Sequence, residues 1–243
     1  MIAMTTDTSQ QKYKHPPLNR SVKGRKPLAR IFNRIWGVLV RFFYRPRFYG
    51  VENIPADGPV ILTGNHTSLM DVTLIHPVVP RWVYWVAKDE LRTKPFLGKI
   101  FTSFEVIYLE RDKLDVTAVK QIMGKLRGNE VLGIFPQGTR VAADKIQESG
   151  ASTGLVSIMQ KTGAAIVPFY IDAPYRLFKP MDVIFGEAYV LPKGKRKASE
   201  EVMEALQNTV MRKIFDLGDI AYRPEREEHD AAILRDHSEE FTG

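Results

Sequence analysis

Residues 60–71 read VILTGNHTSLMD, an apolar strand followed by a polar turn and the beginning of a helix. The β-branched and apolar residues at its start are typical of a buried strand. Thr67 or Ser68 can cap the helix expected over 68–76. His66 is therefore predicted in the turn at the carboxyl end of a strand, the edge at which open α/β sheets bind ligands.

The same alternation of apolar runs and helix-length segments continues along the chain. Further strands are predicted at 82–87, 106–109, 131–135, 165–171 and 182–185, and further helices at 113–126, 150–162 and 198–216. Strands that alternate with helices favour a mixed, largely parallel sheet covered by helices. We therefore predict one α/β domain over 47–218. The acidic C-terminal tail, 219–243, is expected to be a loose end or a short surface helix.

The composition limits the class of protein. The chain has 243 residues, 44% of them hydrophobic and 26% charged, enough for one good core or at most two small ones. It contains no cysteine, which excludes a disulfide framework, a thiolate nucleophile and a Cys-ligated metal. No run approaches the roughly 20 apolar residues that span a bilayer, and the first residues lack the apolar stretch of a signal peptide. We expect the chain to stay in the cytoplasm.

Positive charge is concentrated at the N-terminus. The net charge of the chain is +7, yet residues 1–49 hold 11 basic side chains and one acidic side chain, a net +10. Residues 1–26 are basic and poor in large apolar groups, so they are predicted to form a disordered arm. An anionic partner is therefore expected at the N-terminal end.

An amphipathic helix is predicted over 27–46, beginning at Pro27. At about 100° per residue its arginines share an arc of about 60° and apolar side chains occupy most of the rest. These arginines are Arg30, Arg34, Arg41 and Arg45. A narrow cationic stripe on a wide apolar body is typical of a helix in a membrane interface. The alternative is an ordinary helix that packs on the domain and presents a solvated charged face.

Two segments carry residues suited to chemistry. Asp71 follows His66 by five residues, so its carboxylate can reach one imidazole nitrogen and make the histidine a general base for a hydroxyl. The alternative is a structural hydrogen bond in a capped helix. The second segment, 135–140, reads FPQGTR and combines a glycine turn with Arg140, which suits a phosphate. Its alternative is a surface turn with a solvated arginine.

Taken together, these motifs and their order resemble the glycerolipid acyltransferase family, the 1-acylglycerol-3-phosphate acyltransferases and their glycerol-3-phosphate relatives. The matching residues are His66, Ser68 and Asp71 in the first motif, Ile107, Leu109 and Arg111 in the second, Phe135, Pro136, Gly138, Thr139 and Arg140 in the third, and Val167 and Pro168 in the fourth. A lysine-bearing segment that contains Lys88 lies between the first two motifs, as in the family. The resemblance covers about residues 48–190.

The resemblance implies a reaction without a protein nucleophile. His66, oriented by Asp71, would take the proton of a free hydroxyl on a lysophospholipid acceptor, whose oxygen attacks an acyl thioester. Backbone donors in the first or third motif would stabilise the oxyanion. The implied substrate-binding residues are Asn65, Ser68, Lys88, Arg111, Gln137, Gly138, Thr139 and Arg140. Lys88, Arg111 and Arg140 are the candidates for the acceptor phosphate.

The expected partners are a lysophospholipid, acyl-CoA or acyl carrier protein as donor, and an anionic membrane surface. The protein is therefore expected at the cytoplasmic face of the cell membrane as a peripheral protein in phospholipid biosynthesis. No motif for a metal or nucleotide cofactor is present. Glycerol-3-phosphate or another lysolipid stays open as the acceptor, and the donor stays undecided.

Two residues depart from the family pattern. Gln137 replaces the glutamate of the third motif, which keeps an acceptor oxygen but loses the charge, so it leaves the identity of the acceptor open. Glu105 replaces the glycine of the second motif. A strand edge is expected to tolerate that side chain because it can reach solvent.

Two competing functions belong to other classes of protein. Residues 150–154 match the G-x-S-x-G elbow of serine hydrolases, with Ser152 as nucleophile, but the elbow requires a strand directly before it and none is predicted there. A helix start with small residues is the alternative. The basic N-terminal segment could also bind nucleic acid through phosphates, but this would not explain the wide apolar body of the helix at 27–46. We therefore expect no nucleic-acid partner.

Overall fold

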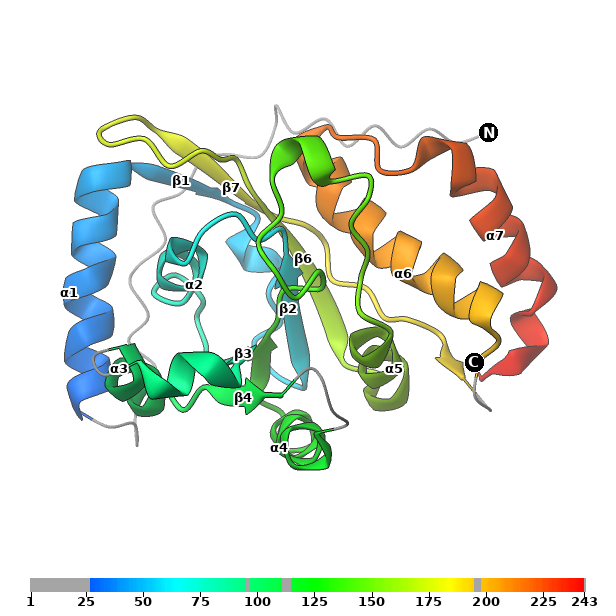
Figure 1. Ribbon diagram of the computed structural model, residues 1–243, viewed down its shortest axis with the longest axis horizontal. Coiled ribbons are helices and arrows are strands. Elements are labelled where there is room, and N and C mark those ends of the chain that lie inside the picture. The colour runs from blue at the N-terminus through cyan, green and yellow to red at the C-terminus, as the bar shows by residue number, and fades with distance from the viewer. Residues whose placement is uncertain (1–26, 95–96, 111–114, 195–197, 243) are drawn as a thin grey trace.

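A seven-stranded sheet organises the protein (Figure 1). The computed structural model describes residues 27–94, 97–110, 115–194 and 198–242, so the predicted basic arm 1–26 and Arg111 lie outside the described residues. The strand order is β1-β7-β6-β2-β5-β3-β4, and all neighbours are parallel except β6 and β7. The predicted mixed, largely parallel sheet is confirmed.

The strands of the main sheet agree with the predicted apolar runs to within about two residues at either end, with one addition. Their bounds are β1 Pro46–Tyr49, β2 Val60–Gly64, β3 Val83–Lys88, β4 Ile107–Leu109, β5 Val131–Gly133, β6 Ala165–Ile171 and β7 Met181–Phe185, besides a small antiparallel pair of β8 Lys193–Gly194 and β9 Phe241–Thr242. The edge strand β1 was not predicted, because its four residues follow the arginine-rich helix without an apolar run. It pairs with β7, and the Arg47 guanidinium meets the Asp182 carboxylate there.

Helices cover both faces of the sheet. Their bounds are α1 Pro27–Tyr44, α2 Met70–Ile75, α3 Leu97–Ser103, α4 Val116–Arg127, α5 Thr153–Thr162, α6 Glu200–Phe215 and α7 Glu227–Asp236. Alternate side chains of β2 show the two layers. Ile61 packs in the core beneath α4, α5 and α6, whereas Val60 and Leu62 pack in the core beneath α1 and α2. Both cores are closed, as expected for an α/β domain with two covered faces.

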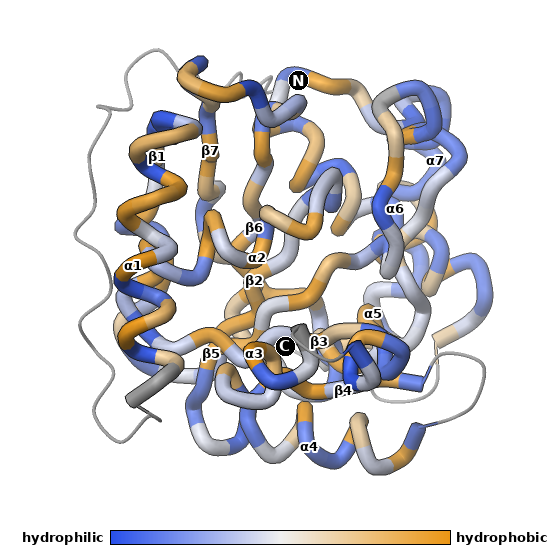
Figure 2. The backbone as a smooth tube through the Cα atoms, turned by 60° about the vertical axis from the view of Figure 1, so that its left-hand side comes forward, coloured by the Kyte–Doolittle hydropathy of each residue, from blue (hydrophilic) through white to orange (hydrophobic). Residues whose placement is uncertain are grey.

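Helix α1 lies along one side of the domain, and hydrophobic residues occur along its length (Figure 2). Ala29, Asn33 and Val40 are buried against the domain. The opposite side exposes a second apolar strip: Ile31, Ile35, Val38, Leu39 and Phe42. Exposed arginines border this strip at Arg30, Arg34 and Arg45. The helix therefore packs on the domain, as the alternative interpretation expected, but its outer face is apolar as well as cationic; the membrane interface stays a prediction. None of the described helices is long and apolar enough to cross a membrane.

Over its described part the acidic C-terminal tail forms a surface helix, the second of the two predicted alternatives, and not a loose end. Helix α7 packs on α6, and its Asp230 is 1% exposed. That carboxylate binds the Asn208 side chain at 2.9 Å and the Arg212 guanidinium. The helical period of apolar residues in α7 is hard to recognise in the sequence. One of its buried positions is occupied by Asp230, which forms an ion pair with Arg212.

Glu105 needs a different explanation from the one that the sequence suggested. Its φ is 56°, in the left-handed region that favours glycine. The glutamate therefore carries backbone strain, and its contact with Lys125 at 3.7 Å is a weak surface pair. The left-handed backbone conformation explains why the family has glycine at this position; exposure at a strand edge does not.

Candidate active site

The carboxyl ends of five parallel strands meet at one edge of the sheet, and the first motif leaves β2 at this edge. Helix α2 begins at Met70, two residues later than predicted, and Ser68 Oγ accepts a hydrogen bond from the Met70 N–H at 3.2 Å. His66 therefore lies in the turn and Asp71 in the first turn of the helix. The arrangement agrees with the predicted location.

His66 and Asp71 are hydrogen-bonded. The distance from Nδ1 of His66 to Oδ2 of Asp71 is 2.8 Å, and the Asp71 side chain is completely buried. The same oxygen accepts the backbone N–H groups of Thr67 at 2.8 Å and Ser68 at 2.9 Å. Because the Asp71 carboxylate only accepts hydrogen bonds, Nδ1 of His66 is the donor and carries the imidazole proton. Nε2 is thereby left with a lone pair that can accept a proton.

Tyr175 completes the surroundings of Asp71, and sequence reasoning missed it. Its phenol donates to Oδ1 of Asp71 at 2.7 Å across a sequence separation of 104 residues. Burial, and next the Asp71 carboxylate, raises the pKa of the Tyr175 phenol well above its ordinary value, so the phenol stays protonated and donates. Tyr175 follows the apolar strand of the fourth motif, which was the available signal. No local spacing connects it with Asp71.

Asn65 fixes the position of the turn. Its Nδ2 donates to the carbonyl of Ile171 at 2.9 Å and its Oδ1 accepts the Ile171 N–H at 2.8 Å. The amide is buried and joins the end of β2 to the end of β6. Asn65 thus holds the backbone beside His66, whereas the resemblance implied substrate binding.

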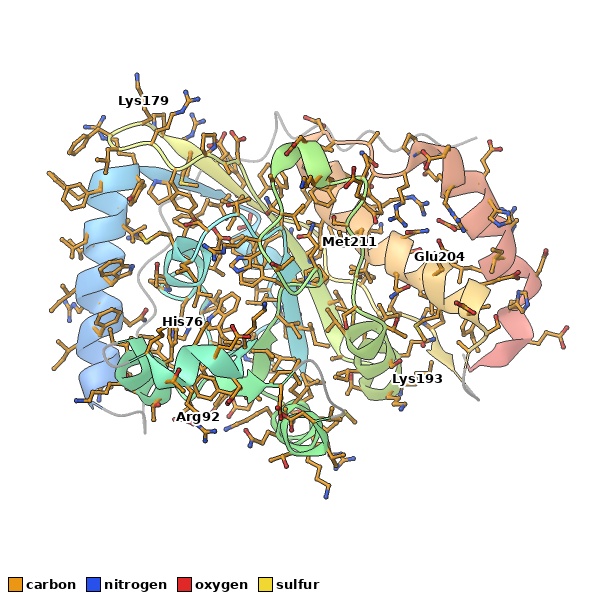
Figure 3. All side chains as sticks on the ribbon, viewed as in Figure 1. His76, Arg92, Lys179, Lys193, Glu204 and Met211 are labelled. Carbon is orange, nitrogen blue, oxygen red and sulfur yellow. The ribbon has the colours of Figure 1, made fainter. Side chains whose placement is uncertain are left out.

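Aromatic rings fix the plane of the imidazole. The ring of His66 stacks on Phe135 with centroids 3.9 Å apart, and Phe135 stacks on Trp85 at 5.5 Å. Gly133 permits this arrangement, since a Cβ there would lie 2.5 Å from the Trp85 ring. Figure 3 shows how densely side chains fill the region around these strand ends.

His66 faces an open cavity of about 470 Å³ at this edge. Its polar lining includes Lys88, Gln137, Thr139 and Arg140, and its apolar wall includes Val72, Trp85, Phe101 and Leu155. A second, small void of about 30 Å³ with an apolar lining shares Val72, Trp85 and Phe101 with it and reaches α1. The cavity therefore presents a base, cations and an apolar wall together.

The third motif forms a turn that is tied to the first. The N–H of Gly138 donates to the carbonyl of Phe135 at 3.0 Å, and Gly138 has a φ of 67°, which only glycine adopts without strain. The N–H of Val141 donates to the carbonyl of His66 at 3.0 Å. The turn thereby holds the 135–141 segment against the candidate base.

The side-chain amide of Gln137 forms a hydrogen bond inside the protein. Its Nε2 donates to Oγ of Ser149 at 2.8 Å, and that hydroxyl donates to the carbonyl of Ile146 at 2.7 Å. A glutamate in this position has no N–H to give to Ser149. Ser149, in the following loop, thus accepts a hydrogen bond that glutamine can donate and the family's glutamate cannot.

Cations occupy the cavity wall. Lys88 lies at the end of β3 and Arg140 in the third motif, and both are exposed. Within the described residues neither forms an ion pair. Their charges are thus available to an anionic ligand. Thr139 is exposed beside them.

Ser152 also lines the cavity, at the start of α5. The described segment before it contains the short 3-10 turn Ala143–Lys145 and no strand, so the strand that a hydrolase elbow requires is missing. The N–H of Ser152 donates to the carbonyl of Pro136 at 2.9 Å, which joins α5 to the third motif. Among the described residues no group of His, Asp and Glu is arranged to hold a metal ion.

The sequence profile of the Acyltransferase family matches residues 45–172, more than half of the chain. The chain belongs to the acyltransferase family. This confirms the predicted enzyme class. The match runs from β1 to the end of β6 and includes the His66–Asp71 pair and the third motif.

Named relatives of this acyltransferase agree with the family. The 1-acyl-sn-glycerol-3-phosphate acyltransferase of Bacillus subtilis (strain 168) is 28% identical over 177 residues, 70% of this chain and 87% of that protein. The enzyme of the same name from Helicobacter pylori is 27% identical over 171 residues, 66% of this chain and 72% of that protein. These names confirm the predicted resemblance.

A solved structure agrees with the fold. The crystal structure of the 1-acyl-sn-glycerophosphate acyltransferase PlsC from Thermotoga maritima superposes with a TM-score of 0.57. It is 24% identical, and the superposition covers 81% of this chain and 80% of that chain.

Proposed function

We propose that this acyltransferase moves an acyl chain from an acyl thioester to the free hydroxyl of 1-acylglycerol-3-phosphate and so produces phosphatidic acid for phospholipid biosynthesis. The observation that carries the proposal is the hydrogen bond between the cavity-facing His66 and the buried Asp71, in a chain of this family. The names of the Bacillus and Helicobacter relatives support the choice of acceptor.

The chemistry uses Nε2 of His66 as general base. Nε2 removes the proton of the acceptor hydroxyl while its oxygen attacks the thioester carbon, so the C–O bond forms and the C–S bond breaks. The imidazolium then returns the proton to the departing thiolate. Asp71 holds the ring and stabilises the imidazolium in the intermediate step. The oxyanion donors are expected among the backbone N–H groups of the first and third motifs.

The remaining cavity residues suit the two substrates. Lys88 and Arg140 are placed to bind the phosphate of the acceptor, and the apolar wall with Val72 and Trp85 suits an acyl chain. Asn65 and Ser68 are assigned a positioning role, because their polar groups bind backbone. Acyl-CoA and acyl carrier protein are both anionic and both remain candidate donors.

The proposal places the enzyme at the cytoplasmic face of the membrane as a peripheral protein. Its support is the outer face of α1, which combines exposed apolar side chains with arginines. Such a face binds anionic headgroups and the acyl boundary of a leaflet. The lysophospholipid acceptor resides in this layer.

The deciding experiment offers labelled acyl-CoA and labelled acyl carrier protein to the purified chain with a panel of acceptors. The panel contains 1-acylglycerol-3-phosphate, glycerol-3-phosphate and a lysolipid without a phosphate. Phosphatidic acid is the expected main product. His66→Ala is expected to lose at least about a hundredfold in turnover, the usual minimum contribution of a general base.

The matched control is the exposed His229, whose change to alanine is expected to leave turnover unchanged. Circular dichroism verifies that both variants fold. If His66→Ala keeps turnover within tenfold of the wild type, the base assignment is wrong. If the wild type prefers another acceptor, the assignment of the substrate is wrong while the acyltransferase class stands.

A further inference from the structure

The loop between β6 and β7 exposes large apolar side chains at its tip. Residues Arg176 to Pro180 are all exposed, and Leu177 and Phe178 expose 59% and 49% of their surface. Sequence patterns do not reveal this pair, because two apolar residues in a short loop have no periodicity. Such a pair at a tip is costly in water unless it is covered by something apolar.

This tip is continuous with the outer face of α1. The ring of Phe178 lies 6.0 Å from Phe42 and 5.7 Å from Phe43, and the N–H of Phe178 donates to the carbonyl of Phe43. In Figure 1 the loop lies beside the C-terminal end of α1, and Figure 3 shows Lys179 at its tip. The apolar strip of α1 thus extends beyond the helix onto a second segment far along the chain.

The charges on the two segments have one sign. Exposed cations border the apolar side chains at Arg30, Arg34, Arg45, Arg176 and Lys179. Neither 27–49 nor 173–181 contains an aspartate or glutamate. An apolar centre with a purely cationic border is complementary to a leaflet that contains anionic lipids.

The backbone of the loop is strained at Phe178. Phe178 has a φ of 60°, a conformation that is unfavourable for a bulky side chain and easy for glycine or asparagine. Its ring is nevertheless half exposed, so burial alone does not offset this strain. Strained residues of this kind are typical of functional positions.

We propose that the outer face of α1 and the 176–179 loop together form a docking surface that binds an anionic membrane leaflet. Leu177 and Phe178 insert beside Phe42, while Arg176 and Lys179 bind headgroups. This rests on the proposed function for the location of the acceptor, but it concerns a segment outside the reaction site.

A second copy of the chain is a poorer occupant for this surface. A symmetric dimer places the same cationic border on both partners, and like charges at an interface are unfavourable. The two segments offer no carboxylate to neutralise those charges. A lipid leaflet supplies both the anions and the apolar layer.

The loop also reaches the candidate active site. Tyr175, directly before it, packs on Tyr44 of α1 at 5.4 Å between centroids and binds Asp71. The docking surface is therefore attached to the edge of the sheet where His66 lies. Membrane contact at this loop would keep the enzyme beside lipids that enter the cavity.

The test measures binding of the full chain to vesicles of phosphatidylglycerol and phosphatidylcholine in equal parts, with phosphatidylcholine vesicles for comparison. The variant combines Leu177→Ser with Phe178→Asn, because asparagine tolerates the left-handed backbone. Removing two inserting side chains is expected to weaken binding to the anionic vesicles about tenfold or more. The control is Val116→Ser on α4, which removes a 49% exposed apolar side chain elsewhere and should not change binding.

Three further readouts separate the possible results. The double variant should unfold cooperatively, with the circular dichroism spectrum of the wild type, and its turnover with a water-soluble short-chain acceptor should be unchanged. Unchanged vesicle binding would overturn the proposal, as would a wild-type dimer in sedimentation that the double variant abolishes. Wild type that binds vesicles through the loop yet acylates no acceptor would refute the proposed function alone.

Discussion

Replacing Tyr175 with phenylalanine tests how the buried carboxylate is stabilised. The change removes one oxygen and keeps the ring that packs on Tyr44. Among the described residues, Oδ1 of Asp71 then retains only the Thr67 hydroxyl at 3.4 Å, a weak contact. Because Asp71 is completely buried, water cannot replace the lost donor. A hydrogen bond to a charged group contributes about 1.5–3 kcal/mol, so the free energy of unfolding should fall by about this amount.

Urea unfolding followed by circular dichroism measures this loss as a shift in midpoint at constant slope. The matched control is Tyr189→Phe, since the Tyr189 hydroxyl is buried and has no hydrogen-bond partner among the described residues. That change should be neutral or stabilising. A loss below about 0.5 kcal/mol for Tyr175→Phe, or an equal loss for both variants, would refute this account.

The difference between wild type and Tyr175→Phe should also depend on pH. Folding raises the pKa of the Tyr175 phenol, whereas the unfolded chain releases this proton near its ordinary pKa of about 10. Above that pH the unfolded state binds fewer protons than the folded state, so the stability of the wild type falls as pH rises. The difference should be largest below about pH 10 and shrink above it. A difference that grows at high pH would contradict the assignment.

Three more predictions concern other residues. Asp230→Ala should lower the free energy of unfolding by about 3–5 kcal/mol, because it leaves the largely buried Arg212 charge unpaired; urea unfolding measures it, with the exposed Asp236→Ala as control. Glu105→Gly should not lower the free energy of unfolding, whereas Glu105→Val should lower it by about 1–3 kcal/mol, because valine is strained in the left-handed backbone conformation of this position. Equal thermal midpoints for the two variants would contradict this. Gln137→Glu should cost about 1 kcal/mol by removing the amide proton that Ser149 accepts, which an unchanged urea midpoint would exclude.

The sequence predicted the elements whose signals are local. The central strands β2, β5 and β6 are apolar runs between turns, and His66 and Asp71 are close in sequence, so periodicity and spacing located them. The helix from Pro27 was predicted for the same reason. Its outward apolar strip could not be separated from its inward one, because that depends on which side the domain lies.

The parts that sequence reasoning missed depend on contacts between distant residues. Tyr175 meets Asp71 across 104 residues, and Asn65 meets Ile171 across 106. The edge strand β1 is defined by β7, more than 130 residues later. Glu105 was misjudged because a positive φ leaves no trace in composition. Such features follow from the closure of the sheet, which no short segment specifies.

The stack of Trp85, Phe135 and His66 ties the interior of the protein to its chemistry. Trp85 is 2% exposed and its Nε1 donates to His76 at 3.2 Å, so it belongs to the core although it also lines the cavity. Because the three rings are stacked, a change in the tilt of Trp85 would move Phe135 and, with it, the imidazole that faces the cavity. Substitutions in this part of the core and the orientation of the His66 ring are therefore coupled during evolution. An apparently conservative replacement of the tryptophan would first be seen as slow turnover in a protein that still folds.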